Sequence, residues 1–131
     1  MKTGLSIGVH IEERLRASEA LQSKVAGRVF PIAAVSGTQK PYICYTRTGI
    51  TPDYTKDGWA GDTVNVAIEI VADGYKSAVE LAELVREQLE DSTAEYGEWE
   101  VRDCELMRAV DGYALELDAY LISLEFSFET Y

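Results

Sequence analysis

Few side chains in this sequence of 131 residues are of the types that carry out catalysis or bind metals. His10 is the only histidine, and no Ser or Cys stands near it in a catalytic pattern, so we expect it on the surface of a helix rather than as a general base. Cys44 and Cys104 lie far apart in apolar, strand-like runs. Their spacing suits neither a zinc site nor a disulfide framework, and we expect two buried thiols.

The short motifs of the common enzyme families do not occur in the sequence. Neither a glycine-rich phosphate loop nor a nucleophile elbow is present. We therefore expect no catalytic residue, no cofactor and no metal site, and a protein that is not an enzyme. Two alternatives stay open. One is a small-molecule-binding or enzymatic domain of unknown substrate with its pocket between a helix and a sheet. The other is an acidic adaptor that binds another protein.

A row of glutamates is the first candidate surface for contact with another protein. Glu80, Glu83, Glu87 and Glu90 recur at intervals of three and four residues, which places them on one stripe of a helix. The stripe is either an acidic surface for a basic subunit or adaptor partner, or a solvated helix face. The spacing alone does not separate these two interpretations.

A pair of aromatic residues is the second candidate. Tyr54 and Trp59 fall within residues 48–61, where several glycines and a proline indicate a long connection. Connections of this length are commonly functional or mobile. Aromatic side chains on such a loop either anchor a partner or fold back over the core of their own domain.

Charge is distributed unevenly along the chain. The net charge is −11 and the isoelectric point is about 4.4. Residues 1–72 carry a net charge of +1, whereas residues 73–131 carry −12. This balance argues against specific nucleic-acid binding, which requires clustered Lys and Arg. No apolar run approaches the ~18 residues of a membrane span and no signal sequence is evident, so we expect an intracellular protein that does not enter membranes.

Hydrophobic periodicity predicts an α+β fold over residues 1–131 as a single domain. Ile7, Ile11 and Leu15 form one helical stripe. A second short helix follows at Glu19–Val25 and ends at Gly27. The longest predicted helix covers residues 75–91, with Asp73 as its N-cap.

The remaining segments alternate between apolar and polar residues, as strands do. Strands are predicted at residues 28–35, 42–47, 62–72, 98–108 and 119–131. A change of parity near Arg102 and Asp103 predicts a bulge, and Asp111–Gly112 reads as a turn. We expect one mixed, mostly antiparallel sheet of about five strands, with the N-terminal helix and the long central helix packed on one face.

The order and spacing of these elements resemble a known family. The similarity begins with the helix end and extended segment Leu21, Val25, Gly27, Arg28, Val29, Phe30 and Pro31, and continues with Pro41 and Tyr42. An alternating strand then follows from Val64 to Ile70, and a helix closes with Val85, Arg86 and Leu89. Two terminal strands complete the pattern. In these features the chain resembles the bacteriophage tail-completion or head–tail joining proteins, a family first described as a domain of unknown function and similar in fold to tail terminators.

The resemblance implies a structural, non-enzymatic phage or prophage protein. It would complete or terminate the tail tube, or join the tail to the head, as an oligomeric ring at the head–tail junction of the virion. It would be made in the host cytoplasm, be monomeric when purified alone, and assemble with other tail and connector proteins. DNA would pass through the ring without specific binding. The unequal charges of the two halves of the chain could supply the two different faces that ring contacts require.

Overall fold

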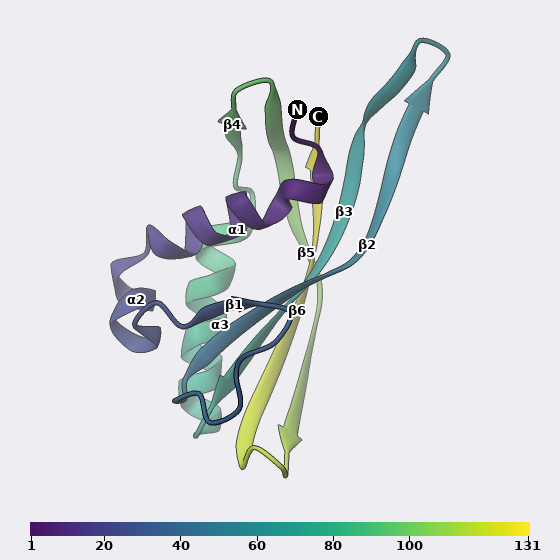
Figure 1. Ribbon diagram of the computed structural model, residues 1–131. Coiled ribbons are helices and arrows are strands. Elements are labelled where there is room, and N and C mark those ends of the chain that lie inside the picture. The colour runs from purple at the N-terminus through teal and green to yellow at the C-terminus, as the bar shows by residue number, and fades with distance from the viewer.

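The computed structural model describes residues 1–131 and contains one twisted sheet with helices on one of its faces (Figure 1). The sheet has six strands in the order β1-β2-β3-β6-β5-β4, and every neighbouring pair is antiparallel except β1 with β2. The strands are β1 (Val29–Pro31), β2 (Tyr42–Thr55), β3 (Gly58–Ala72), β4 (Ala94–Tyr96), β5 (Trp99–Ala114) and β6 (Ala119–Thr130). The helices are a 3₁₀ turn η1 (Gly4–Ser6), α1 (Ile7–Arg16), α2 (Glu19–Val25) and α3 (Tyr75–Leu89). The predicted fold class is confirmed, with β4 as one additional short strand.

The hydrophobic core lies between the helices and one face of the sheet. The alternation predicted for the central strands is confirmed, because Val64, Val66, Ile68 and Ile70 of β3 are all buried against the helices. The same face of β6 contributes its alternate residues, and the apolar stripes of α1 and α3 close the core from the other side. The predicted bulge is present, since the pairing of β5 with β6 shifts register between Val101 and Asp103.

The N-termini of α2 and α3 are capped in different ways. At α2 the Ser18 hydroxyl accepts a hydrogen bond from the Leu21 amide, the usual contact of an N-cap. At α3 the predicted cap is wrong, because the N-cap residue is Gly74 and makes no side-chain cap bond. The carboxylate of Asp73 instead lies 3.0 Å from the Lys40 ammonium group.

Two predicted connections are strands in the structure. Residues 48–61 do not form a long loop: β2 and β3 continue as a hairpin as far as a turn at Lys56 and Asp57, and this hairpin projects beyond the rest of the fold (Figure 1). Asp111 and Gly112 lie within β5, and the turn to β6 comes after Ala114. Pairing with a neighbouring strand overrides turn propensity at both places. The predicted strand over 28–35 is reduced to the three residues of β1.

His10 is buried, so its predicted position on the helix surface is wrong. Its Nε2 lies 2.8 Å from Ser92 Oγ and its Nδ1 lies 3.0 Å from Tyr96 Oη. Since the Ser92 hydroxyl donates to the Leu89 carbonyl, His10 Nε2 carries the proton that is donated to Ser92. His10 thus joins α1 to the segment that follows α3. Burial, and then the positive charge of Arg14, lower the pKa of His10 to about 4.

The buried imidazole makes stability depend on pH. The unfolded chain, in which the pKa of His10 is about 6.5, takes up a proton between about pH 6.5 and 4, whereas the folded protein does not. This histidine therefore lowers the free energy of unfolding as the pH falls through that window. We expect the melting temperature of the wild type to fall more steeply than that of His10→Gln from pH 7 to pH 4, since carboxylates titrate in both. Parallel melting curves for the two proteins across this range would contradict the assignment.

Candidate functional site

The projecting hairpin carries both aromatic candidates, and the structure separates their roles. Tyr54 and Trp59 are paired across β2 and β3 near the tip. The side chain of Tyr54 is 71% exposed and packs against no other ring. The Trp59 ring is half-buried and stacks on Tyr131, with the ring centroids 5.9 Å apart. Tyr54 is therefore available to a partner, while Trp59 packs on its own chain.

The stack at the base of the hairpin joins three segments that are distant in sequence. The guanidinium carbon of Arg102 lies 4.3 Å from the centre of the Tyr131 ring, on which Trp59 also stacks. Gly61 lets the strands approach here, because its φ is +109° and an added Cβ would collide with the Thr130 carbonyl. The projecting hairpin is thereby fixed to the C-terminal strand.

Asp62 is only 5% exposed and forms hydrogen bonds at the base of the hairpin, on the side of the sheet that faces the helices. Its Oδ1 accepts a hydrogen bond of 3.0 Å from the Trp59 indole, and its Oδ2 accepts one of 2.8 Å from the Gly4 amide. The Thr130 hydroxyl donates to the Asp62 carbonyl at 3.2 Å. One buried residue thus ties the N-terminus, the hairpin and the C-terminus together, and both chain ends lie beside the base of the hairpin (Figure 1).

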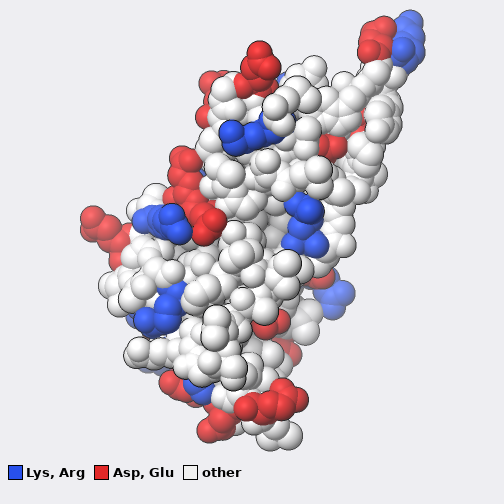
Figure 2. Space-filling model, viewed as in Figure 1, with Lys and Arg blue, Asp and Glu red and all other residues white.

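Glu80, Glu83 and Glu87 lie on the outer surface of α3, as predicted, whereas Glu90 follows the helix as its C-cap residue with extended backbone. Glu80 lies 3.7 Å from the Lys24 ammonium, and Glu90 forms an ion pair with Arg86. Glu83 and Glu87 are exposed and have no ion-pair partner. On the face of the molecule shown in Figure 2, acidic and basic groups are interspersed, and one of each sits at the tip of the hairpin. The four glutamates therefore do not form a continuous acidic surface, because two of them are paired with basic residues.

The face of the sheet opposite the helices is polar and mainly acidic. It carries the outward-pointing residues of the three long central strands, five of which are acids: Glu69, Asp103, Glu105, Glu125 and Glu129. Arg108 and Arg102 are basic residues of this face, and the Arg108 guanidinium lies 3.1 Å from the Glu125 carboxylate. At one end of this face a small apolar cluster around Tyr42 and Cys44 is covered by the chain that follows β1.

Both outer long strands leave part of their edge unpaired. β1 pairs with β2 only over Ile43–Tyr45 and the Ile32 amide donates to the Tyr45 carbonyl, so residues 46–55 have no neighbour on that side. β4 pairs with β5 only as far as Val101, and the Asp91 amide donates to the Cys104 carbonyl, so residues 105–114 are free. Sequence reasoning missed these edges because it placed residues 48–61 and 111–112 in connections. An unpaired strand edge presents amide and carbonyl groups to another chain.

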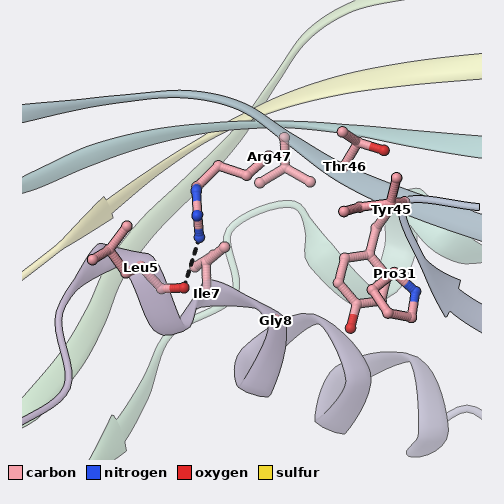
Figure 3. Close-up of a pocket in the computed structure, with 9 residues that line it drawn as sticks. Leu5, Ile7, Gly8, Pro31, Tyr45, Thr46 and Arg47 are labelled. Carbon is pink, nitrogen blue, oxygen red and sulfur yellow. Dashed lines mark hydrogen bonds between the residues drawn. The ribbon is translucent and has the colours of Figure 1, made fainter.

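A shallow groove of about 240 Å³ adjoins the free edge of β2. It is lined by residues from η1 and the start of α1, from the end of β1 and the residue after it, from β2 and from β3: Leu5, Ile7, Gly8, Pro31, Ile32, Tyr45, Thr46, Arg47 and Val66 (Figure 3). Arg47 reaches across the groove and donates a hydrogen bond of 2.7 Å to the Leu5 carbonyl. No carboxylate lies within ion-pair distance of its guanidinium group.

Among the residue types found in enzyme sites, His10, Ser92 and Tyr96 lie together, but His10 and Ser92 are buried. No three His, Cys, Asp or Glu side chains are grouped so that they could hold a metal ion. Cys44 and Cys104 are both buried, as predicted, but they contribute to clusters on opposite faces of the sheet. Burial, and then the nearby Glu69, raise the pKa of the Cys44 thiol, and burial also raises that of Cys104. No helix is both long enough and apolar enough to cross a membrane.

The helix-backed sheet, with its polar bare face and free edges, defines a structural α+β protein whose prominent features are surfaces for other chains. Residues 9–131 match the family described as Tail completion protein gp17, and the chain belongs to this family. A solved structure described as "Virion of native gene transfer agent (GTA) particle" contains a chain of similar fold, with a TM-score of 0.80 and 19% sequence identity. The similarity covers 92% of this chain and 90% of that chain. No curated protein matches the sequence.

Family membership confirms the tail-completion role that the resemblance implied. The chain is a structural phage protein that completes the tail, and its place is in the virion tail.

The contrast between the two aromatic residues can be tested by paired substitutions. Trp59→Ala removes the stack on Tyr131 and the hydrogen bond to Asp62, and we expect it to lower the free energy of unfolding by about 1–3 kcal/mol. Tyr54→Ala removes an exposed ring, and its effect should be below about 0.5 kcal/mol. Urea denaturation measures both values. Equal losses would show that Trp59 does not fix the hairpin.

Proposed function

We propose that residues 1–131 act as one domain and one non-enzymatic building block, and that copies of it complete the tail as a ring. The observation that carries this proposal is the placement of the two free strand edges. They belong to different strands, β2 and β5, at opposite sides of one sheet. A contact between two different surfaces repeats from copy to copy, and it closes into a ring when the rotation between copies allows it.

Strand direction supports contact between these edges. β2 is antiparallel to β3, β3 to β6, and β6 to β5, so β2 and β5 run in opposite directions within one chain. Copies related by rotation about a ring axis keep these directions. The β2 edge of one copy therefore meets the β5 edge of the next as an antiparallel pair, which forms strong ladders of hydrogen bonds.

The positions of the free segments along the sheet determine how the strands tilt. In this pairing, Thr51 of one copy lies opposite Val110 of the next copy. Within one chain, Thr51 is level with Glu129 and Asp103, whereas Val110 is level with Ser123, six residues away along β6. At about 3.3 Å per residue this is an offset of about 20 Å, against about 19 Å for the width of four strands. The ratio corresponds to a tilt of about 45°, at the upper end of the ~35–45° typical of closed barrels. A closed ring of tilted strands is therefore compatible with this geometry.

In such a ring we propose that the bare face of the sheet lines the lumen and that the helices lie outside. The bare face is rich in carboxylates, with Glu69, Glu105 and Glu129 all exposed. Like charges repel the DNA phosphates, so DNA passes without adhering. The helices keep their apolar stripes buried in the core and present their polar stripes to the surroundings.

The candidate residues then face two directions. Tyr54, at the end of the projecting hairpin, is placed to contact a tail or connector protein beyond the ring, and Trp59 supports the hairpin from below. The stripe of Glu80, Glu83, Glu87 and Glu90 on α3 faces outward, where its unpaired members Glu83 and Glu87 would meet a basic partner. This assigns the aromatic hairpin and the acidic helix to contacts with other proteins rather than to the contact between copies.

Engineered cysteines test the contact between edges. Thr51→Cys and Val110→Cys place exposed thiols on the bare face, one at each free edge. In particles assembled with the tail proteins of the same phage, we expect oxidation of the double variant to give a ladder of cross-linked multimers. Each single variant should remain uncross-linked, because the two edges differ. The buried native thiols remain unreactive.

A matched control uses Asn65→Cys in place of Thr51→Cys. Asn65 is exposed on the same face but lies on the central strand β3. Asn65→Cys with Val110→Cys should give no ladder. Cross-linked dimers of a single-cysteine variant, or no multimers of the double variant in assembled tails, would refute ring formation through these edges.

The isolated chain should behave differently from the assembled one. We expect light scattering of the purified protein to give the mass of a monomer, because the net charge of −11 makes copies repel one another. Raising the salt concentration should favour association, since it screens this repulsion. Stable rings of the isolated protein at low salt would contradict this expectation.

A further inference from the structure

The groove beside β2 is apolar and open, and the positive charge of Arg47 in it has no carboxylate partner. Leu5 and Ile32 on its rim are 61% and 75% exposed. Arg47 crosses it without a carboxylate partner, although the chain as a whole has many more acids than bases. A ligand that suits this groove therefore offers an apolar side chain next to a carboxylate.

The backbone at the rim of the groove is strained. Ile32 has a φ of +68°, a conformation that β-branched residues rarely adopt. This conformation directs the chain away from β2 directly after β1, which ends the pairing and leaves the next part of the β2 edge open. Strained, exposed apolar residues of this kind cluster at binding sites.

The turn between β5 and β6 has the matching chemistry. Leu115 is 85% exposed, the most exposed leucine of the chain, and Glu116 follows it without an ion-pair partner. The turn is held in shape from both sides: Lys40 donates to the Leu117 carbonyl at 2.7 Å, and Tyr113 donates to the Asp118 carboxylate. It presents an apolar side chain and a carboxylate on a supported loop.

The lengths of the free edges bring these two features together. Residues 46–55 of β2 and residues 105–114 of β5 are segments of equal length. When they pair antiparallel, Ala114 of one copy lies opposite Thr46 of the other, and the extra residue at the β2 bulge between Arg47 and Gly49 brings Val110 opposite Thr51. The turn that follows Ala114 then reaches Tyr45 and Pro31, where the groove begins.

We propose that this groove receives the β5–β6 turn of a second copy of the chain, with Leu115 between Leu5 and Ile32 and the Glu116 carboxylate paired with Arg47. The inference rests on the proposed ring and names the contact that sets its register. Pairing between strand edges alone allows the strands to slip, whereas a side chain seated in a groove fixes one alignment. The apolar contact and the ion pair together select a second copy over other occupants.

A charge exchange tests the ion pair. We expect Arg47→Glu and Glu116→Arg each to weaken assembly on tails by about tenfold, because each leaves two like charges in contact. The variant with both substitutions should regain assembly, since the pair is restored with its signs reversed. Glu116→Arg should keep the wild-type melting temperature, because this side chain is exposed and unpaired, whereas the variants with Arg47→Glu should show only a small decrease from the loss of the exposed hydrogen bond to Leu5. Single variants that assemble normally, or a double variant that is not rescued, would overturn the proposal.

A second experiment separates this contact from the pairing of the edges. Leu5→Cys with Leu115→Cys should cross-link neighbouring copies in assembled tails, whereas Leu5→Cys with Val35→Cys should not, although Val35 is also exposed. If the edge cysteines at positions 51 and 110 cross-link and this pair does not, the groove contact is wrong and the ring stands. If neither pair cross-links, the ring through these edges fails as well.

Discussion

The pairing of β3 with β6 is the constraint on which the other features depend. Eleven residue pairs join the two strands without a register shift, from Asp62–Thr130 to Ala72–Tyr120. A slip of one residue would turn every apolar side chain of either strand to the opposite face. Because the register holds, α1 and α3 cover one face, and the carboxylates gather on the other. The polar bare face and the direction of both outer strands follow from this central pair.

The short strands at the two sides of the sheet leave strand edges open that most proteins cover. β1 and β4 are three residues each, and they pair only with residues near the start of β2 and β5. The open halves carry other protection, since Pro52 interrupts one edge and charged residues such as Glu105 and Asp111 lie on the other. These features discourage indiscriminate pairing. They still leave room for a partner whose charges and shape match.

The sequence was sufficient to predict the parts of the fold that face the core. Strict alternation in β3 and β6, the helical stripe of α1 and the parity change near Arg102 all reflect burial, and each was predicted correctly. The projecting hairpin was not, because both of its faces are exposed and no alternation marks it. Its Gly49, Pro52 and Asp57 read as a loop, and only the pairing with β3 shows that they lie in or beside strands.

The candidate site was predictable to a smaller extent, because the roles of its residues depend on their neighbours in space. Spacing placed the four glutamates on one helix stripe, but it gave no sign that Lys24 and Arg86 neutralise two of them. The difference between Tyr54 and Trp59 depends on Tyr131, more than 70 residues away in sequence. His10 did carry a local signal, since it stands three residues after Ile7 and next to Ile11 on the buried stripe.

Electrostatic repulsion and edge pairing act over different distances, and this difference bears on where the proposed ring would assemble. Repulsion between copies with a net charge of −11 extends over roughly the Debye length, about 8 Å at physiological ionic strength. Hydrogen bonds between strand edges act only at about 3 Å. Free copies are therefore kept apart before their edges can meet. In the proposed ring, a tail that binds several copies side by side would raise their effective concentration and offset the repulsion, so the proposal places closure on the tail and not in solution.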